Sequence, residues 1–100
     1  MTDLKLHIKV CGYRTPQRYV LLRMVWAALT QLRASYPGLQ AEVEEVRDVE
    51  QILRYTPVLV SASLVVEEQL VCTGYVPDKQ HVLLWLQNSV LDKIGQNQPS

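Results

Sequence analysis

The chain has 100 residues, of which 48% are hydrophobic and 20% are charged, and its acidic and basic side chains balance to a net charge of zero. This length predicts one domain, and this composition is that of an ordinary globular domain. Because the sequence has no run of basic residues that could bind along a phosphate backbone, we expect no nucleic-acid partner. The N-terminus lacks the pattern of a signal peptide and no segment has the length of a membrane span, so we expect a cytoplasmic protein without membrane contact.

The N-terminal part of the chain predicts a strand followed by a long helix. In residues 4–11, LKLHIKVC, apolar side chains alternate with lysine or histidine, which is the period of a strand. Pro16 suits the first position of a helix because its missing N–H would be unpaired there. Thr15 just before it is expected to cap this helix, which we place from Pro16 to about residue 34.

This helix carries more apolar side chains than one buried face requires. Its core stripe repeats at the 3.6-residue spacing of a helix and consists of Leu21, Val25, Ala28 and Leu32. A second apolar row lies on its flank and consists of Leu22, Trp26 and Leu29. The sequence YPGL then ends the helix with a Pro-Gly turn.

A second strand is predicted at 40–46, QAEVEEV, in which Glu42 and Glu44 share one face. If this strand lies beside the first, the two glutamates face the lysines and His7 of that strand. Each pair of opposite charges across neighbouring strands adds between a few tenths of a kcal/mol and about 1 kcal/mol.

A short helix and a hairpin follow. Asp48, with a glutamine three residues later, forms a variant of the capping box and indicates a helix to about Arg54. The β-rich runs 55–66 and 70–75 are separated by the polar residues EEQ, a pattern that is typical of a hairpin.

Residues 77–95 predict a final helix, which begins at Pro77 or Asp78. We expect residues 1–95 to form a single domain and residues 96–100 to form a flexible tail. The order of elements is therefore β-α-β-α-β-β-α, an α/β fold. Its first strand, helix and second strand form a parallel crossover that should be right-handed.

This order resembles the thioredoxin fold over nearly the whole chain. The likeness rests on the loop-to-helix junction GYRTPQR and on the Thr-Pro of YTPVLV, while GYVPDKQHVLLWL is similar to the last strand and helix of small bacterial and archaeal thioredoxin-like proteins. The resemblance implies a mixed four-stranded sheet in the order 2-1-3-4, with strand three antiparallel to strand one. It also implies that the Thr56–Pro57 bond is cis and lies next to residues 13–18.

The chain departs from the redox members of this superfamily at its first helix. Where those members have a Cys-x-x-Cys pair, this sequence has Thr15 and Arg18, and disulfide exchange requires two thiols. We expect the two cysteines of the chain, Cys11 and Cys72, to be small buried hydrophobic residues, and burial should raise the pKa of Cys11. The KaiB clock-protein family and the related sensor domain of the SasA kinase also lack the pair. The chain resembles them at LKLHIKVCGYRTP, LRASYPGLQAEVEEV, YTPVLV and GYVPDKQHVLLWL.

The first candidate binding surface joins the start of the long helix to the Thr-Pro segment. Backbone N–H groups at a helix start attract anions, and the resemblance implies that the Thr-Pro segment holds extended peptides by backbone hydrogen bonds. The candidate residues are Tyr13, Arg14, Thr15, Gln17, Arg18, Tyr55, Thr56, Pro57, Gly74 and Tyr75. The plainer interpretation is a capped helix flanked by two solvated arginines.

The second candidate surface is the apolar excess on the two long helices. Its residues are Leu22, Trp26, Leu29, Leu84, Trp85 and Leu91. The helices either bury these rows against each other or present them to a second copy of the chain or to another partner.

The sequence shows no catalytic constellation, and its cysteines and histidines lack the spacing of metal ligands. We therefore expect no metal and no cofactor, and we interpret the chain as a redox-inactive module that binds a protein or peptide. The alternative is a thiol-linked redox or glutathione-binding protein that uses a lone cysteine or a bound thiol.

Overall fold

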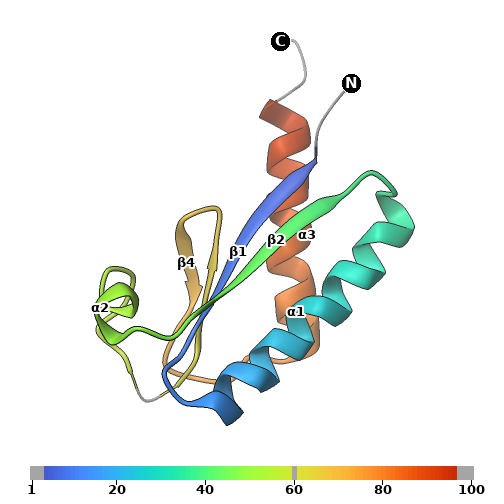
Figure 1. Ribbon diagram of the computed structural model, residues 1–100. Coiled ribbons are helices and arrows are strands. Elements are labelled where there is room, and N and C mark those ends of the chain that lie inside the picture. Colours follow the sequence, from blue (N-terminus) through green and yellow to red (C-terminus); the bar gives the residue numbers. More distant parts are fainter. Residues whose placement is uncertain (1–3, 60, 97–100) are drawn as a thin grey trace.

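The described part of the chain folds into three helices and four strands, in the predicted order (Figure 1). The computed structural model describes residues 4–59 and 61–96. The elements are β1 (Lys5–Cys11), α1 (Thr15–Ser35), β2 (Gln40–Val46), α2 (Val49–Ile52), β3 (Ser63–Val66), β4 (Gln69–Cys72) and α3 (Lys79–Gln96). Because α3 includes Gln96, the rest of the predicted tail, residues 97–100, lies outside the described residues.

The four strands form one mixed sheet in the order β2-β1-β3-β4, which confirms the predicted order. β1 and β2 run parallel, in a register that extends from Lys5 opposite Gln40 to Cys11 opposite Val46. β3 is antiparallel to β1 and forms a hairpin with β4. The long helix between β1 and β2 allows a parallel crossover, whereas the short turn between β3 and β4 allows only an antiparallel pair.

The helices divide between the two faces of the sheet. α1 and α3 contact each other on one face and cover the main core. That core includes Leu6, Ile8 and Val10 of β1, Leu64 and Val66 of β3, Leu21, Val25 and Leu29 of α1, and Val82, Leu86 and Val90 of α3. α2 lies on the other face, where Ile52 packs with Cys11, Val46 and Val65. Apart from Cys11 and Val46, the alternate side chains of β1 and β2 on this second face are charged or polar, and we call it the polar face.

The Thr56–Pro57 bond is trans, so the predicted cis bond is wrong, and the third strand is much shorter than the predicted run 55–66. The Thr56 hydroxyl accepts a hydrogen bond from the backbone N–H of Val58 at 3.1 Å. This local turn bends the chain at the Thr-Pro step, and β3 begins only at Ser63. The trans isomer is lower in energy by about 0.5–1 kcal/mol, and a turn held by the threonine hydroxyl does not require the cis form.

The three helices are capped in different ways. α1 begins at Thr15, so Arg14 is the N-cap residue and its side chain makes no capping bond. The predicted cap by Thr15 is therefore wrong, because this residue already lies in the first turn. Asp48 caps α2, as predicted, and accepts the backbone N–H of Glu50 at 3.2 Å. Asp78, one of the two predicted starts of the last helix, accepts the backbone N–H of His81 at 2.9 Å.

The turn between β3 and β4 has an unusual backbone. Glu67 and Glu68 have φ values of 52° and 65°, in the left-handed region that glycine or asparagine usually occupies in two-residue hairpin turns. Glu67 pairs with Lys93 at 3.4 Å and accepts the backbone N–H of His7 at 3.1 Å. Glu68 pairs with Lys9 at 2.9 Å. Contacts with β1 and α3 therefore stabilise this turn, although glutamate rarely adopts its left-handed backbone conformation.

The second apolar row of α1 belongs mostly to the core. Leu29 is fully buried and Leu22 packs against the main core, whereas Trp26 is 44% exposed. Of the two alternatives that the sequence left open, Leu29 therefore follows burial and is not part of an exposed interface. On α3, Leu84 and Leu91 are about half exposed, and Trp85 packs partly against the core.

Leu29→Ala should lower the free energy of unfolding by about 3 kcal/mol, because it leaves a cavity in the main core. Leu84→Ala is the matched control on the exposed side of α3, and it should change stability by less than about 0.5 kcal/mol. Urea denaturation followed by circular dichroism measures both effects. Similar losses from the two substitutions would contradict the burial of Leu29.

Candidate functional site

Three connecting segments meet at one end of the sheet, which we call the loop end (Figure 1). They are the β1–α1 loop (12–14), the segment that follows α2 (56–59) and the β4–α3 loop (73–78). The hydroxyls of Thr56 and Thr73 lie 2.9 Å apart, which ties the second segment to the third. Gly12 lies against Ala62, so that a Cβ added to the glycine would be 3.5 Å from the alanine.

The exposed members of the predicted binding set lie in or beside these segments. They are Tyr13, Arg14, Thr15, Pro57, Gly74 and Tyr75. Arg14 Nε donates to the Tyr13 hydroxyl at 3.1 Å, and the guanidinium lies 5.5 Å from the centre of the tyrosine ring. Tyr75 is 56% exposed. The loop end thus presents aromatic and cationic side chains to solvent.

Arg18 is an internal residue rather than an anion ligand. Its side chain is 4% exposed, and its Nε donates to Glu45 Oε1 at 2.9 Å. Its Nη1 donates to the carbonyl oxygen of Gly12, also at 2.9 Å. The hydrogen bond from Arg18 holds the pKa of the Glu45 carboxyl below its usual range. The guanidinium therefore fixes the β1–α1 loop to β2, and both sequence interpretations of this arginine as a surface group are wrong.

Thr56 is also internal. Its hydroxyl and that of Ser63 each lie 2.9 Å from the hydroxyl of Thr73, so the three groups form a chain of hydrogen bonds. Thr56 is buried, whereas the neighbouring Pro57 is exposed. Thr56 therefore positions the loop end and does not offer its side chain to a ligand.

Tyr55 lies on the polar face. Its hydroxyl accepts a hydrogen bond from Lys9 Nζ at 2.6 Å and donates to Glu68 Oε2 at 2.8 Å. The hydrogen bond with Tyr55 raises the pKa of Lys9, and the hydrogen bonds from Lys9 and from Tyr55 lower the pKa of Glu68. Because Glu68 is in the hairpin turn, at the far end of β3 from the loop end, the Tyr55 hydroxyl is not grouped with Tyr13 and Tyr75.

The polar face confirms the predicted pairing of charges between β1 and β2. Glu42 binds Lys5 at 3.1 Å and His7 at 2.9 Å, and the hydrogen bond from Lys5 lowers the pKa of the glutamate. Glu44 lies opposite Lys9 in the register, but Lys9 pairs with Glu68. Among the described residues, no cationic side chain is within ion-pair distance of Glu44.

Both thiols are buried, as predicted. Burial raises the pKa of the Cys11 thiol to about 11, and burial also raises the pKa of Cys72. The Cys72 Sγ donates to the carbonyl oxygen of Tyr75 at 3.5 Å. At neutral pH both thiols are therefore protonated and covered, which is the opposite of what a redox nucleophile requires.

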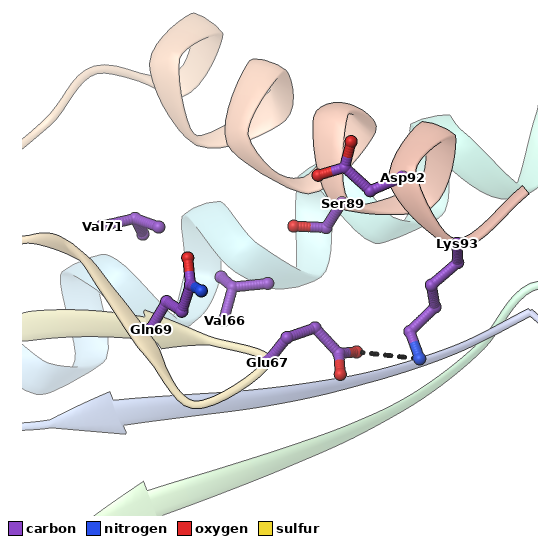
Figure 2. A pocket seen from close by; sticks show the side chains of 7 residues that line it. All are labelled: Val66, Glu67, Gln69, Val71, Ser89, Asp92 and Lys93. Atoms are coloured by element: carbon purple, nitrogen blue, oxygen red, sulfur yellow. Dashed lines mark ion pairs between the residues drawn. The ribbon is translucent and has the colours of Figure 1, made fainter. Parts of the chain in front are cut away.

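Figure 2 shows a pocket of about 250 Å³ between the hairpin and the C-terminal half of α3. It is lined by Val66, Glu67, Gln69, Val71, Ser89, Asp92 and Lys93. Glu67 and Lys93, which both line it, form an ion pair, and Ser89 Oγ donates to the backbone carbonyl of Trp85 in its own helix. No sequence pattern predicts this pocket, because its lining comes from two separate segments with no common motif.

Within residues 4–59 and 61–96, no three His, Cys, Asp or Glu side chains gather closely enough to hold a metal ion. None of the described helices is long and apolar enough to cross a membrane. A scan of known protein-family models gives no match to the chain, and a search of curated proteins gives none either.

Native Cys11 should react with a thiol reagent at pH 8 roughly 100-fold more slowly than in urea, because a pKa of about 11 in place of 9.0 lowers its thiolate fraction by that factor. A Cys72→Ala variant isolates the Cys11 signal. The unfolded thiol ionises near pH 9.0 and the folded one near 11, so the stability that Cys11 contributes is complete below pH 9.0 and falls between these values. Labelling of native Cys11 within seconds at neutral pH would contradict its burial.

Arg18→Met should lower Tm by roughly 10 °C, because it removes two hydrogen bonds of a buried charged group. Arg23→Met, on the exposed strip of the same helix, is the control and should leave Tm nearly unchanged.

Because the folded-state pKa of Glu45 is lowered, the contribution of this carboxylate to stability is complete above about pH 4.5 and is lost as the pH falls through the folded value. Glu45→Gln should therefore weaken the fall of Tm in acid, which differential scanning calorimetry measures. An unchanged acid profile would contradict this role of Glu45.

Proposed function

We propose that the protein is a redox-inactive thioredoxin-like domain that binds a protein or peptide partner through the loop end. The order of its elements and the strand order β2-β1-β3-β4 support the thioredoxin-like assignment, because they are the ones that the sequence resemblance implies. The trans Thr56–Pro57 bond departs from that resemblance. The proposal therefore relies on the exposed side chains of the loop end and not on a cis-proline surface.

The observation that carries the proposal is the exposure of Tyr13, Arg14 and Tyr75 on loops whose backbone is held in place by buried side chains. We call these held loops the frame. Arg18 joins the β1–α1 loop to Glu45 of β2, and Thr56 bonds to Thr73, which in turn bonds to Ser63 of β3. Tyrosine and arginine are common anchors of protein interfaces, since they supply a large contact area and several hydrogen bonds. A frame that is ordered before binding also reduces the entropy lost on association.

The alternative of thiol redox or glutathione chemistry lacks an observation in its favour. Cys11 is buried with a raised pKa, and Arg18 is engaged by Glu45 and Gly12. A thiol compound bound at the start of α1 would therefore have no thiolate of Cys11 to react with, and the guanidinium of Arg18 would not be free to bind it.

The test compares partner binding by the wild-type protein and by a loop-end variant that combines Tyr13→Ser, Arg14→Glu and Tyr75→Ser. Each protein is crosslinked in an extract of the cells that express it, and a captured partner is then purified and titrated. We expect the variant to bind this partner at least tenfold more weakly, because loss of one anchor commonly costs that much or more.

Leu91→Ser is the matched control, because Leu91 is exposed and lies in the second half of α3, whereas the loop end adjoins the first residue of this helix. It should leave binding unchanged. Equal binding by the loop-end variant and the wild type would contradict the proposed surface, and reduction of insulin by the wild-type protein would contradict the redox-inactive assignment.

A further inference from the structure

A second surface, the outer edge of β2, is independent of the loop end. β2 is an edge strand of the sheet and pairs only with β1 among the described strands. It has seven residues, whereas the opposite edge strand β4 has four. A regular edge strand of this length offers a row of backbone groups to another extended chain.

The hydrogen bonds of β2 show which backbone groups face outward. Gln40 donates its N–H to the Leu4 carbonyl at 2.7 Å, and the Val46 carbonyl accepts the N–H of Gly12 at 2.9 Å. Alternate residues of a strand turn both backbone groups to the same side, so Gln40, Glu42, Glu44 and Val46 face β1. The N–H and C=O groups of Ala41, Val43 and Glu45 therefore point away from the sheet.

The side chains of the edge differ on its two faces. On the polar face it carries Glu42 and Glu44, both exposed, and Glu44 has no cationic partner among the described residues. On the other face it carries Ala41 and Val43, which are only half buried. One side of the edge is therefore acidic and the other is apolar.

α1 extends the apolar side. Arg18 near its start binds Glu45, and Arg33 near its end donates to the Leu39 carbonyl at 3.4 Å, so the helix runs alongside the whole of β2 (Figure 1). Leu22 and Trp26 project from the same side of the helix as Arg33. Trp26 thus lies beside the middle of β2 with 44% of its surface exposed.

We propose that this edge binds an extended segment of a partner protein in which basic and apolar residues alternate. The inner edge of β2 already shows the complementary pattern, because β1 places Lys5 and His7 against Glu42 on one face and Leu6 and Ile8 in the core on the other. A segment added outside β2 would pair with the backbone of Ala41, Val43 and Glu45. Its basic side chains would meet Glu42 and Glu44, and its apolar ones would cover Val43 and Trp26.

A second copy of this chain is a poor occupant of the same edge. Two β2 strands side by side would bring the glutamates of one copy against those of the other, and like charges on neighbouring strands destabilise the pair. The acidic row therefore disfavours pairing between copies and at the same time selects a basic partner.

The probe is a short peptide that alternates valine and lysine, and its control has glutamate in place of lysine. Amide hydrogen exchange is measured by NMR on the full chain with each peptide. The lysine peptide should slow exchange at Ala41, Val43 and Glu45, whose N–H groups point outward. It should leave exchange at Glu42 and Glu44 unchanged, since those groups already bond to β1. The glutamate peptide should have no effect.

Two variants with matched controls test the side chains. Glu44→Lys should weaken binding of the lysine peptide about tenfold, because an attraction becomes a repulsion, and Glu50→Lys on α2 is the control for net charge. Trp26→Ala should weaken it to a similar degree, and Leu84→Ala is the control for an exposed apolar residue. Ala41→Pro removes one outward donor and leaves the ladder to β1 intact, so it should reduce binding in a folded protein.

Equal binding of both peptides, unchanged affinity in Glu44→Lys, or protection that appears at β4 instead would overturn the proposal. A dimer of the protein alone that already protects Ala41, Val43 and Glu45 would overturn it as well, since the edge would then belong to a second copy. The loop-end variant should bind the lysine peptide normally, which separates this result from the test of the loop end.

Discussion

The buried guanidinium of Arg18 is the interaction on which the arrangement of the loop end depends. It joins the first turn of α1 to the end of β1 through Gly12 and to β2 through Glu45. A buried cation is tolerated only when it is paired and hydrogen-bonded, so these two contacts must form together. They fix the direction in which α1 leaves the sheet. That direction then decides which side of the helix lies along β2 and where Tyr13 and Arg14 emerge.

Sequence patterns predicted the parts of this fold that depend on local periodicity. The alternation in β1 and β2 predicted strands with nearly the observed bounds, Asp48 caps the helix that it was expected to cap, and Asp78 lies at the start of the last helix. The parallel crossover and the hairpin follow from the lengths of the connections. Each of these features can be derived from residues that are close together in the chain.

The features that sequence patterns missed depend on contacts between distant residues. Arg18 looks like a surface residue because its partner Glu45 is 27 positions away and on another element. Leu29 looks like a flank residue because the helix period does not reveal how much of that flank the rest of the core covers. The run 55–66 looks like one strand, but the Thr56 hydroxyl bonds to Val58 and bends it. Of the residues predicted for one binding surface, Tyr13 and Tyr75 are exposed at the loop end, whereas Arg18 and Thr56 are part of the frame.

The turn at Glu67 and Glu68 has a consequence for the order in which the molecule folds. Each residue holds a left-handed backbone that costs an L-amino acid about 1 kcal/mol or more, so the hairpin has little tendency to form in isolation. The groups that stabilise this turn, His7, Lys9 and Lys93, belong to the first strand and the last helix of the chain. The hairpin should thus close only after β1 and α3 have come together. Folding is then a cooperative event that requires both ends of the chain, and truncation at either end should unfold the hairpin as well.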